Sequence, residues 1–413
     1  MQPLRPTSQS ASALEAYSNG VALLLAAKPG PEVEFERAIA ADPAFALAHA
    51  GEARALFLIA RIPEAKAAAL MARELAKNLP QREKNNVEVV LLTIEGAPAK
   101  AYALAREHLK LYPRDAMVLA PCTGVFGLIG FSGRKGREQE LRQLMEELAP
   151  HWGEDSFFLT QLAFARVETG DIELARKAIE RAMELDPRSA HGAHVKVHVH
   201  YEAGEKVAGL KFLQKWLPDY AKEGLLHCHL NWHVALWQLE LGDHEAATRT
   251  YLNAVHPGAS WGPPINVISD AASFLWRFEL AGRLRDHGRW REVSEYGTRN
   301  FPSAGLAFAD VHKALAYAAS GDALALETLL GQLREREKAG KLLAGPVVPA
   351  LAEGFGAFAR KDYMKALALL EPCMAEHERI GGSRAQRRLI ELTLAAARKL
   401  HYSPRRGVRC VRP

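Results

Sequence analysis

Apolar and polar positions along this chain of 413 residues follow a repeating pattern, in which a Gly-Asp turn precedes an alanine-rich helix. The clearest copy is Gly170-Asp171, followed by Ile-Glu-Leu-Ala, and another copy stands at Gly242-Asp243. Glycine accepts a positive φ at the end of one helix, aspartate caps the next, and alanine lets two helices approach closely. The pattern therefore predicts a series of helical hairpins.

Looser copies of the turn place further anchors along the chain. Taken in order, the anchors are residues 61, 96, 136, 170, 204, 242, 288, 321 and 361. The steps between them scatter around the period of about 34 residues that is typical of tetratricopeptide repeats. We therefore expect an all-α, tightly curved tetratricopeptide-like α-solenoid of about ten hairpins. A generic helical bundle that happens to use Gly-Asp turns is the alternative.

No long low-complexity linker interrupts the repeats, so we expect one repeat domain over residues 13–400. An N-terminal tail over 1–12 and an Arg-rich C-terminal tail over 401–413 would flank it. Hydrophobic residues make up 48% of the chain, which is enough for a large core. Alanine and leucine dominate and β-branched residues are sparse, which also favours helix.

The net charge of +5 is concentrated in the C-terminal tail, where Arg405, Arg406, Arg409 and Arg412 lie. The rest of the chain is nearly neutral, which argues against a nucleic-acid-binding face. The four cysteines are far apart and form no CxxC pair, which argues against a disulfide framework and indicates a reducing cytoplasm. The apolar run over 21–27 is too short to cross a membrane.

Histidine is unevenly distributed along the chain. Seven of the sixteen histidines fall within residues 191–233. Two pairs, His194/His198 and His229/His233, are spaced four residues apart, so each pair shares one face of a helix. The other three are expected to support the site or to face solvent: His191, His200 and His227.

Repeat register relates these pairs to later residues. In tetratricopeptide repeats the first helix of each hairpin lines the concave face, and His233 and His312 each lie nine residues before the glycine of their turn. Asp270 lies on the intervening first helix, with Arg277 further along the same face. We therefore expect both histidine pairs to converge with Asp270, Arg277 and His312 on one concave surface.

Two kinds of chemistry fit this set of side chains. Histidines four apart on a helix can hold a divalent metal ion, for which the candidate ligands are His194, His198, His229 and His233. A histidine beside an aspartate can act as a general acid or base near neutral pH, for which the catalytic candidates are His229, His233, Asp270 and His312. The candidates for substrate binding are His194, Trp232, Trp237 and Arg277. Packing of these residues in the helical core, without any ligand, is the alternative.

The same segments resemble those of the tetratricopeptide repeat protein 38 family. Residues 193–199 (AHVKVHV) are similar to its His-Ala-x-Ala-His-Val signature, and residues 229–236 (HLNWHVAL) to its His-Asn-x-Trp-His-x-Ala-Leu signature. Residues 270–277 and 310–312 resemble two further family segments. The resemblance extends over about residues 10–400, and it implies the fold and the location of the site rather than a reaction.

This chain departs from the family pattern at Tyr201 and Leu230, where glutamate and asparagine are usual. The expected function is binding of a small molecule in a concave His/Asp/Trp-lined pocket, with hydrolytic or metal-assisted activity. The alternative is a non-catalytic scaffold for a peptide or partner protein, although such grooves generally use Asn, Lys and Arg rather than histidine clusters. Self-association of the chain stays open.

Overall fold

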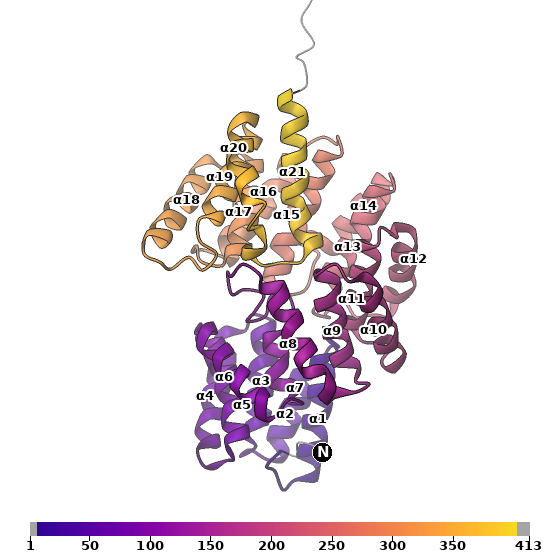
Figure 1. Cartoon of the computed structure of the whole chain (residues 1–413), viewed down its shortest axis with the longest axis vertical. Helices are drawn as coiled ribbons and strands as arrows, with labels where there is room; N and C mark the ends of the chain where they lie inside the picture. Colours follow the sequence, from indigo (N-terminus) through magenta and orange to yellow (C-terminus); the bar gives the residue numbers. More distant parts are fainter. Residues whose placement is uncertain (1–5, 403–413) are drawn as a thin grey trace, which may run out of the picture. The chain divides into compact units, whose positions relative to one another are not determined.

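The computed structural model describes residues 6–402. Within this range the regular elements are α-helices, 3₁₀-helices and a π-helix, and there are no strands (Figure 1). This confirms the expected all-α, tetratricopeptide-like class. From residue 403 onward, the predicted Arg-rich tail lies outside the described residues. Within residues 6–402, no helix combines the length and the apolar composition that a membrane crossing needs.

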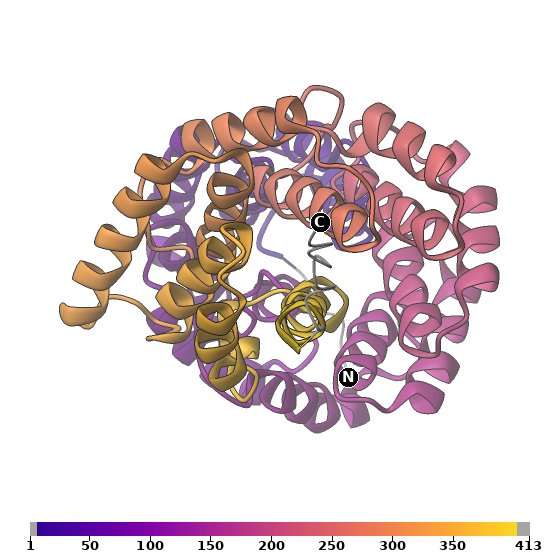
Figure 2. The same ribbon diagram turned by 90° about the horizontal axis from the view of Figure 1, so that it is seen from above.

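The chain forms two compact units. The first contains the residues up to Ala271 together with Gly381–Ala385, and the second contains Ala272–Ile380 and the residues from Gln386 onward. The helices of the first unit are α1 (Ala11–Leu25), α2 (Pro31–Ala41), α3 (Ala46–Leu58), α4 (Ile62–Leu75), α5 (Gln81–Ile94), α6 (Pro98–Leu111), α7 (Ala116–Leu119), α8 (Arg137–Trp152), α9 (Ser156–Glu168), α10 (Ile172–Leu185), α11 (Ala190–Glu202), α12 (Lys206–Trp216), α13 (His227–Glu240) and α14 (His244–Thr250). Short helical turns join or extend them: η1 (Ala76–Asn78), η2 (Ala120–Cys122), η3 (Leu217–Asp219) and the π-helical η4 (Tyr251–Val255). The hairpins from α9 to α14 follow one another in Figure 2, in magenta to pink.

The boundary between the units falls within α15 (Pro264–Leu280), and α21 (Arg384–Tyr402) begins in the first unit. The remaining helices belong to the second unit: α16 (His287–Asn300), α17 (Ala307–Ser320), α18 (Ala323–Lys338), α19 (Val347–Ala359), α20 (Tyr363–Cys373) and η5 (His377–Ile380). The hairpins α17/α18 and α19/α20 pack against each other as neighbouring repeats do.

The Gly-Asp turns act as the sequence predicts. Gly170 has a φ of 87°, and the Asp171 side chain accepts a hydrogen bond from the backbone N–H of Leu174 at the start of α10. Three other aspartates cap their helices in the same way: Asp243 on α14, Asp322 on α18 and Asp362 on α20. Each cap satisfies one N–H that the first turn of a helix otherwise leaves without a partner.

One anchor of the repeat was misplaced. Gly288 lies inside α16, and the turn of this hairpin is at Gly282, which has a φ of 86°. Asp286 caps α16 by accepting from the N–H of Arg289, but it stands four residues after Gly282. Because glycine and aspartate are separated here, no adjacent Gly-Asp pair marks this turn, and the looser match at Gly288 falls on a residue inside the helix.

The close approach of α12 to α13 depends on a missing side chain. A Cβ atom on Gly209 would lie 2.3 Å from Cη2 of Trp237, so only glycine fits at this point. Trp237 is buried there in an apolar cluster with Val197 of α11 and Leu213 of α12. This packing fixes α13 beside the hairpin of α11 and α12, and thereby positions the two histidine pairs.

Candidate functional site

The first histidine pair lies on α11. Ser189 caps this helix by accepting a hydrogen bond from the N–H of Gly192 at 3.0 Å. Four residues apart and on one face, His194 and His198 bring their Nε2 atoms within 3.0 Å of each other. Two imidazole nitrogens at this distance share either a proton or a ligand between them.

The second pair lies on the neighbouring first helix, α13, and completes a cluster of four. The centroids of the His194 and His229 rings are 4.8 Å apart, and those of His198 and His233 are 5.1 Å apart. One ligand-capable atom from each of the four side chains lies within 4.8 Å of those of the other three. All four are buried, with exposed fractions from 0% to 9%. We call these four residues the histidine cluster.

Two buried carboxylates approach Nδ1 atoms of the cluster. Asp270 on α15 accepts a hydrogen bond from Nδ1 of His229 at 2.8 Å. Glu168, the last residue of α9, places Oε1 3.5 Å from Nδ1 of His198. A hydrogen bond from Nδ1 to a carboxylate, as from His229 to Asp270, selects the tautomer in which Nε2 carries the lone pair, and this tautomer can bind a metal through Nε2. Of the four clustered histidines, His229 is thus the one that forms a hydrogen bond with Asp270.

Burial sets the protonation state of the pair on α11. Loss of solvation, reinforced by the neighbouring histidines, lowers the pKa of His194 well below its usual value of 6.5. Burial, with His229 nearby, lowers the pKa of His198 to about 3. Both imidazoles are therefore neutral at pH 7, which leaves their lone pairs available to a ligand.

Aromatic rings pack against the histidine cluster as well. The Trp232 ring stacks on His229 with centroids 5.1 Å apart and an interplanar angle of 15°. Phe164 of α9 meets the His198 ring edge-on at 5.5 Å. Trp237, expected to bind substrate, is packed against Gly209, with its ring centroid 6.1 Å from that of His233. These rings exclude water from the cluster.

Arg277 and His312, the other residues expected at the site, belong to the second unit. His312 is buried and donates a hydrogen bond from Nδ1 to the carbonyl oxygen of Phe308 at 2.7 Å. Burial lowers its pKa to about 4, and the positive charge of Arg277 acts in the same direction. Two residues before His312, Oδ1 of Asp310 lies 3.3 Å from Nζ of Lys313, and Oδ2 accepts a hydrogen bond from the N–H of Gly305.

The three other histidines of the 191–233 segment have individual surroundings. His200 was expected to face solvent, but it is buried, and its Nδ1 lies 2.7 Å from Oε2 of Glu205. Burial, together with the nearby charge of Arg54, lowers the pKa of His191 to about 4. The His227 carbonyl accepts a hydrogen bond from the Asn231 side chain at 2.9 Å.

Glu168 is the residue that sequence reasoning missed. It has no histidine beside it in the sequence, so the spacing of the histidines does not point to it. Its signal was nevertheless present, because it stands two residues before the Gly170 turn and thus at the end of a first helix. An acidic residue on the buried face of a first helix, in a repeat next to those that carry the histidines, is the pattern that indicates it.

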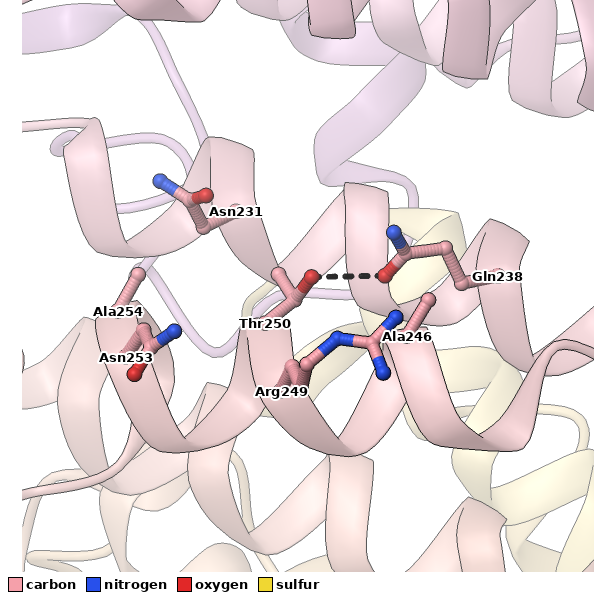
Figure 3. Close-up of a pocket in the computed structure, with 7 residues that line it drawn as sticks. All are labelled: Asn231, Gln238, Ala246, Arg249, Thr250, Asn253 and Ala254. Carbon is pink, nitrogen blue, oxygen red and sulfur yellow. Dashed lines mark hydrogen bonds between the residues drawn. The ribbon is translucent and has the colours of Figure 1, made fainter.

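A separate polar groove lies between α13 and the segment formed by α14 and η4 (Figure 3). Its volume is about 320 Å³, and its lining is Asn231, Gln238, Ala246, Arg249, Thr250, Asn253 and Ala254. Oε1 of Gln238 accepts from the Thr250 hydroxyl at 2.8 Å, so the Gln238 amide group is held in place. The groove includes none of the four clustered histidines. π-helical turns such as η4 are frequent at functional sites.

Comparison with known proteins finds no family model that matches the chain. Similar solved structures include the tetratricopeptide repeat domain of P58(IPK), with 14% identity over 95% of this chain and 98% of that chain, at a TM-score of 0.23. Naa15/Naa10 bound to HypK-THB is similar with 13% identity over 95% of this chain, at a TM-score of 0.24. This chain covers 64% of the latter chain's length. What is established by the helices and their capped turns is a tetratricopeptide-like helical-repeat fold.

Proposed function

We propose that this protein is a helical-repeat protein that binds a transition-metal ion at the histidine cluster. The observation that carries the proposal is the convergence of four buried imidazoles from two helices, with ligand-capable atoms within 4.8 Å of one another. One metal ion can accept a lone pair from each of the four imidazoles, and the free energy of its binding then contributes to the stability of the fold.

The donor set narrows the choice of ion. Neutral imidazoles suit zinc, copper, iron and nickel, whereas magnesium and calcium prefer oxygen ligands. Asp270 supports the proposal, because a carboxylate on Nδ1 of a ligating histidine orients the ring and raises its basicity. We therefore propose zinc or another late first-row metal.

The burial of the cluster favours a structural metal site over a catalytic site that hydrolyses a substrate. A tetrahedral ion held by all four imidazoles has no open position for water or substrate, which is the arrangement of structural sites. The narrower function expected from the sequence, hydrolysis of a small molecule, requires that one imidazole yields its place to substrate. Membership of the tetratricopeptide repeat protein 38 family, resting on the two histidine signatures, is part of the same proposal.

Metal analysis of protein purified without a histidine tag tests this function. We expect roughly one equivalent of a transition metal per chain, by plasma mass spectrometry, after mild purification or after incubation with zinc and gel filtration. The double variant His229→Ala/His233→Ala should lose the metal while keeping its helical circular dichroism. The matched control is His151→Ala/His287→Ala, because both of these histidines are exposed.

Two kinds of result in the metal analysis would contradict the proposal. Metal that survives in the His229/His233 variant, or that is lost equally from the His151/His287 variant, contradicts binding at the cluster. A wild-type protein that takes up no zinc, copper, iron or nickel from solution contradicts the proposed function as a whole.

A second function, binding of a partner protein, is favoured by the polar groove of Figure 3. Its Asn231, Gln238, Arg249 and Asn253 side chains carry amide and guanidinium groups, which are suited to bind the carbonyls and carboxylates of an extended peptide. Arg249→Ala together with Asn253→Ala should abolish capture of an acidic peptide measured by fluorescence anisotropy. Unchanged binding by this variant contradicts the groove as the peptide site.

A further inference from the structure

Glu168 interacts with two different parts of the first unit through its two carboxylate oxygens. It ends α9 and is buried, with an exposed fraction of 4%. Oε1 lies 3.5 Å from Nδ1 of His198, while Oε2 accepts a hydrogen bond from the backbone N–H of Arg384 at 2.8 Å. The Glu168 carboxylate therefore lies between His198 and the backbone N–H of Arg384.

The segment on the second side is Gly381–Ala385, which we call the strap. It belongs to the first unit although more than a hundred residues separate it from Ala271. The Arg137 guanidinium donates to the carbonyl oxygen of Gly382 at 2.6 Å, and the Arg384 side chain lies 3.3 Å from Glu202. Ser383 and Ala385 are buried. These polar contacts, together with the hydrogen bond to Glu168, seat the strap.

We propose that Glu168 is a positioning residue of the metal site and that it couples metal occupancy at the histidine cluster to seating of the strap. The proposal rests on the metal binding proposed above and assigns a regulation to that same site. Glu168 orients His198 on one side and holds the first backbone N–H of α21 on the other. Occupancy and seating then stabilise each other.

The coupling follows from the acidity of an imidazole N–H. An ion bound at Nε2 of His198 withdraws electron density from the ring, which makes Nδ1–H a stronger donor toward Glu168. The 3.5 Å separation, at the long limit for a hydrogen bond, then shortens and fixes the orientation of the carboxylate. The second oxygen is thereby held against the N–H of Arg384, at a helix N-terminus that favours negative charge.

Linkage makes the effect reciprocal. If the bound ion favours the seated strap, the seated strap must strengthen metal binding by the same factor. A purely structural Glu168 behaves differently, because it would anchor the strap equally with and without metal and would leave metal affinity unchanged. Metal affinity and strap protection measured together therefore separate the two roles.

The test uses the full chain, with zinc as the probe, in hydrogen exchange and in competition with a chromogenic chelator. In the wild type, zinc should slow exchange of the strap amides several-fold relative to protein stripped with a chelator. Glu168→Gln can still accept from Arg384 but meets the His198 N–H with an amide that lacks charge. We expect it to weaken zinc binding about 10- to 100-fold and to abolish the zinc-dependent slowing.

Glu202→Gln is the matched control, because Glu202 contacts the side chain of Arg384 and lies on α11 with the first histidine pair. It should leave zinc affinity and the zinc-dependent slowing unchanged. If Glu168→Gln does not fold, Glu168→Asp keeps the charge and should retain part of both effects.

The outcomes distinguish the two proposals. Failure of the wild type to bind zinc overturns the proposed function itself. Zinc binding with no change in strap exchange, or with equal affinities in wild type and Glu168→Gln, overturns the coupling and leaves the metal site standing.

Discussion

Two carboxylate contacts influence the orientation and the tautomer of imidazoles in the histidine cluster. Asp270 and Glu168 each approach an Nδ1 atom, at 2.8 Å on His229 and at 3.5 Å on His198. Both acids come from helices that carry none of the four histidines, so each ties the cluster to another repeat. Because the shorter of these contacts is a formed hydrogen bond, Asp270 should be the stronger influence on ring orientation.

Replacing Asp270 by asparagine tests this influence. Asp270→Asn keeps the size of the side chain but removes the charge that holds His229 in the tautomer with a free Nε2. We expect zinc affinity to fall about 10- to 100-fold, measured by competition with a chromogenic chelator. Asp322→Asn is the control, because asparagine caps α18 as well as aspartate does. Equal affinities for wild type and Asp270→Asn would contradict a supporting role for this acid.

His312 makes a prediction about pH. Its pKa is about 4 in the folded protein and near 6.5 in the unfolded chain, chiefly because of burial. The unfolded chain therefore takes up the proton first, so the contribution to stability is complete above pH 6.5 and is lost as the pH falls toward 4. His312→Gln should remove about 3 kcal/mol from the pH dependence of the unfolding free energy over this window. Urea titrations at several pH values measure it, and parallel curves for the two proteins would refute it.

Elements are held together by how closely their backbones approach. α12 and α13 are in contact where Gly209 faces Trp237, and the position of α13 decides where His229 and His233 lie. Helix propensity alone favours alanine over glycine at an interior position of a helix. The two effects oppose each other at Gly209, and the steric one should win because the obstacle is a buried, fully packed indole.

Two glycine-to-alanine substitutions separate these effects. At Gly209 the added Cβ would lie 2.3 Å from the Trp237 ring, and overpacking should destabilise the protein by about 1–3 kcal/mol. At Gly331 in α18, no atom lies within 4 Å of the added Cβ, so Gly331→Ala should stabilise by roughly 0.5–1 kcal/mol. Unfolding in urea measures both. Similar effects of the two substitutions would show that close packing at Gly209 is not what sets its cost.

At the scale of the whole molecule, a bound ion links folding to metal supply. A ligand that binds only the folded state stabilises it according to the ratio of its free concentration to its Kd. The histidine cluster takes its ligands from α11 and α13, and its supporting acids from α9 and α15. An ion bound there would connect three successive hairpins of the first unit, which begin with α9, α11 and α13. It would also connect them to α15 through Asp270.

Metal removal should therefore lower thermal stability. With free zinc at about 100 times its Kd, we expect roughly 2.7 kcal/mol of added stability, which a chelator removes. Scanning calorimetry of wild type and of His229→Ala/His233→Ala, each with zinc and with chelator, measures the difference. The variant should be insensitive to both additions. A melting temperature of the wild type that is unaffected by zinc or chelator would contradict binding to the folded state.

Repeat patterns were strong enough to predict much of the fold. Adjacent Gly-Asp pairs mark turns at Gly170, Gly242 and Gly321 because local backbone and capping chemistry suffices there. The anchor at Gly288 was wrong because Gly282 and Asp286 are separated by three residues. In the repeat whose turn is near Gly136, the first helix is α7, which has only four residues. The repeat period by itself does not predict this short helix.

By itself, the sequence determined the helical hairpins, their caps and the shared face of each histidine pair, because these depend on spacing along a few turns of chain. Only the tertiary structure decided that ligand-capable atoms of the pairs on α11 and α13 lie within 4.8 Å of one another. It also decided that Asp270 forms a hydrogen bond with His229 and that Glu168 lies 3.5 Å from Nδ1 of His198. Those contacts depend on how closely successive hairpins pack, as where Gly209 admits Trp237. Packing distance between helices arises from many side chains at once, so no local pattern encodes it.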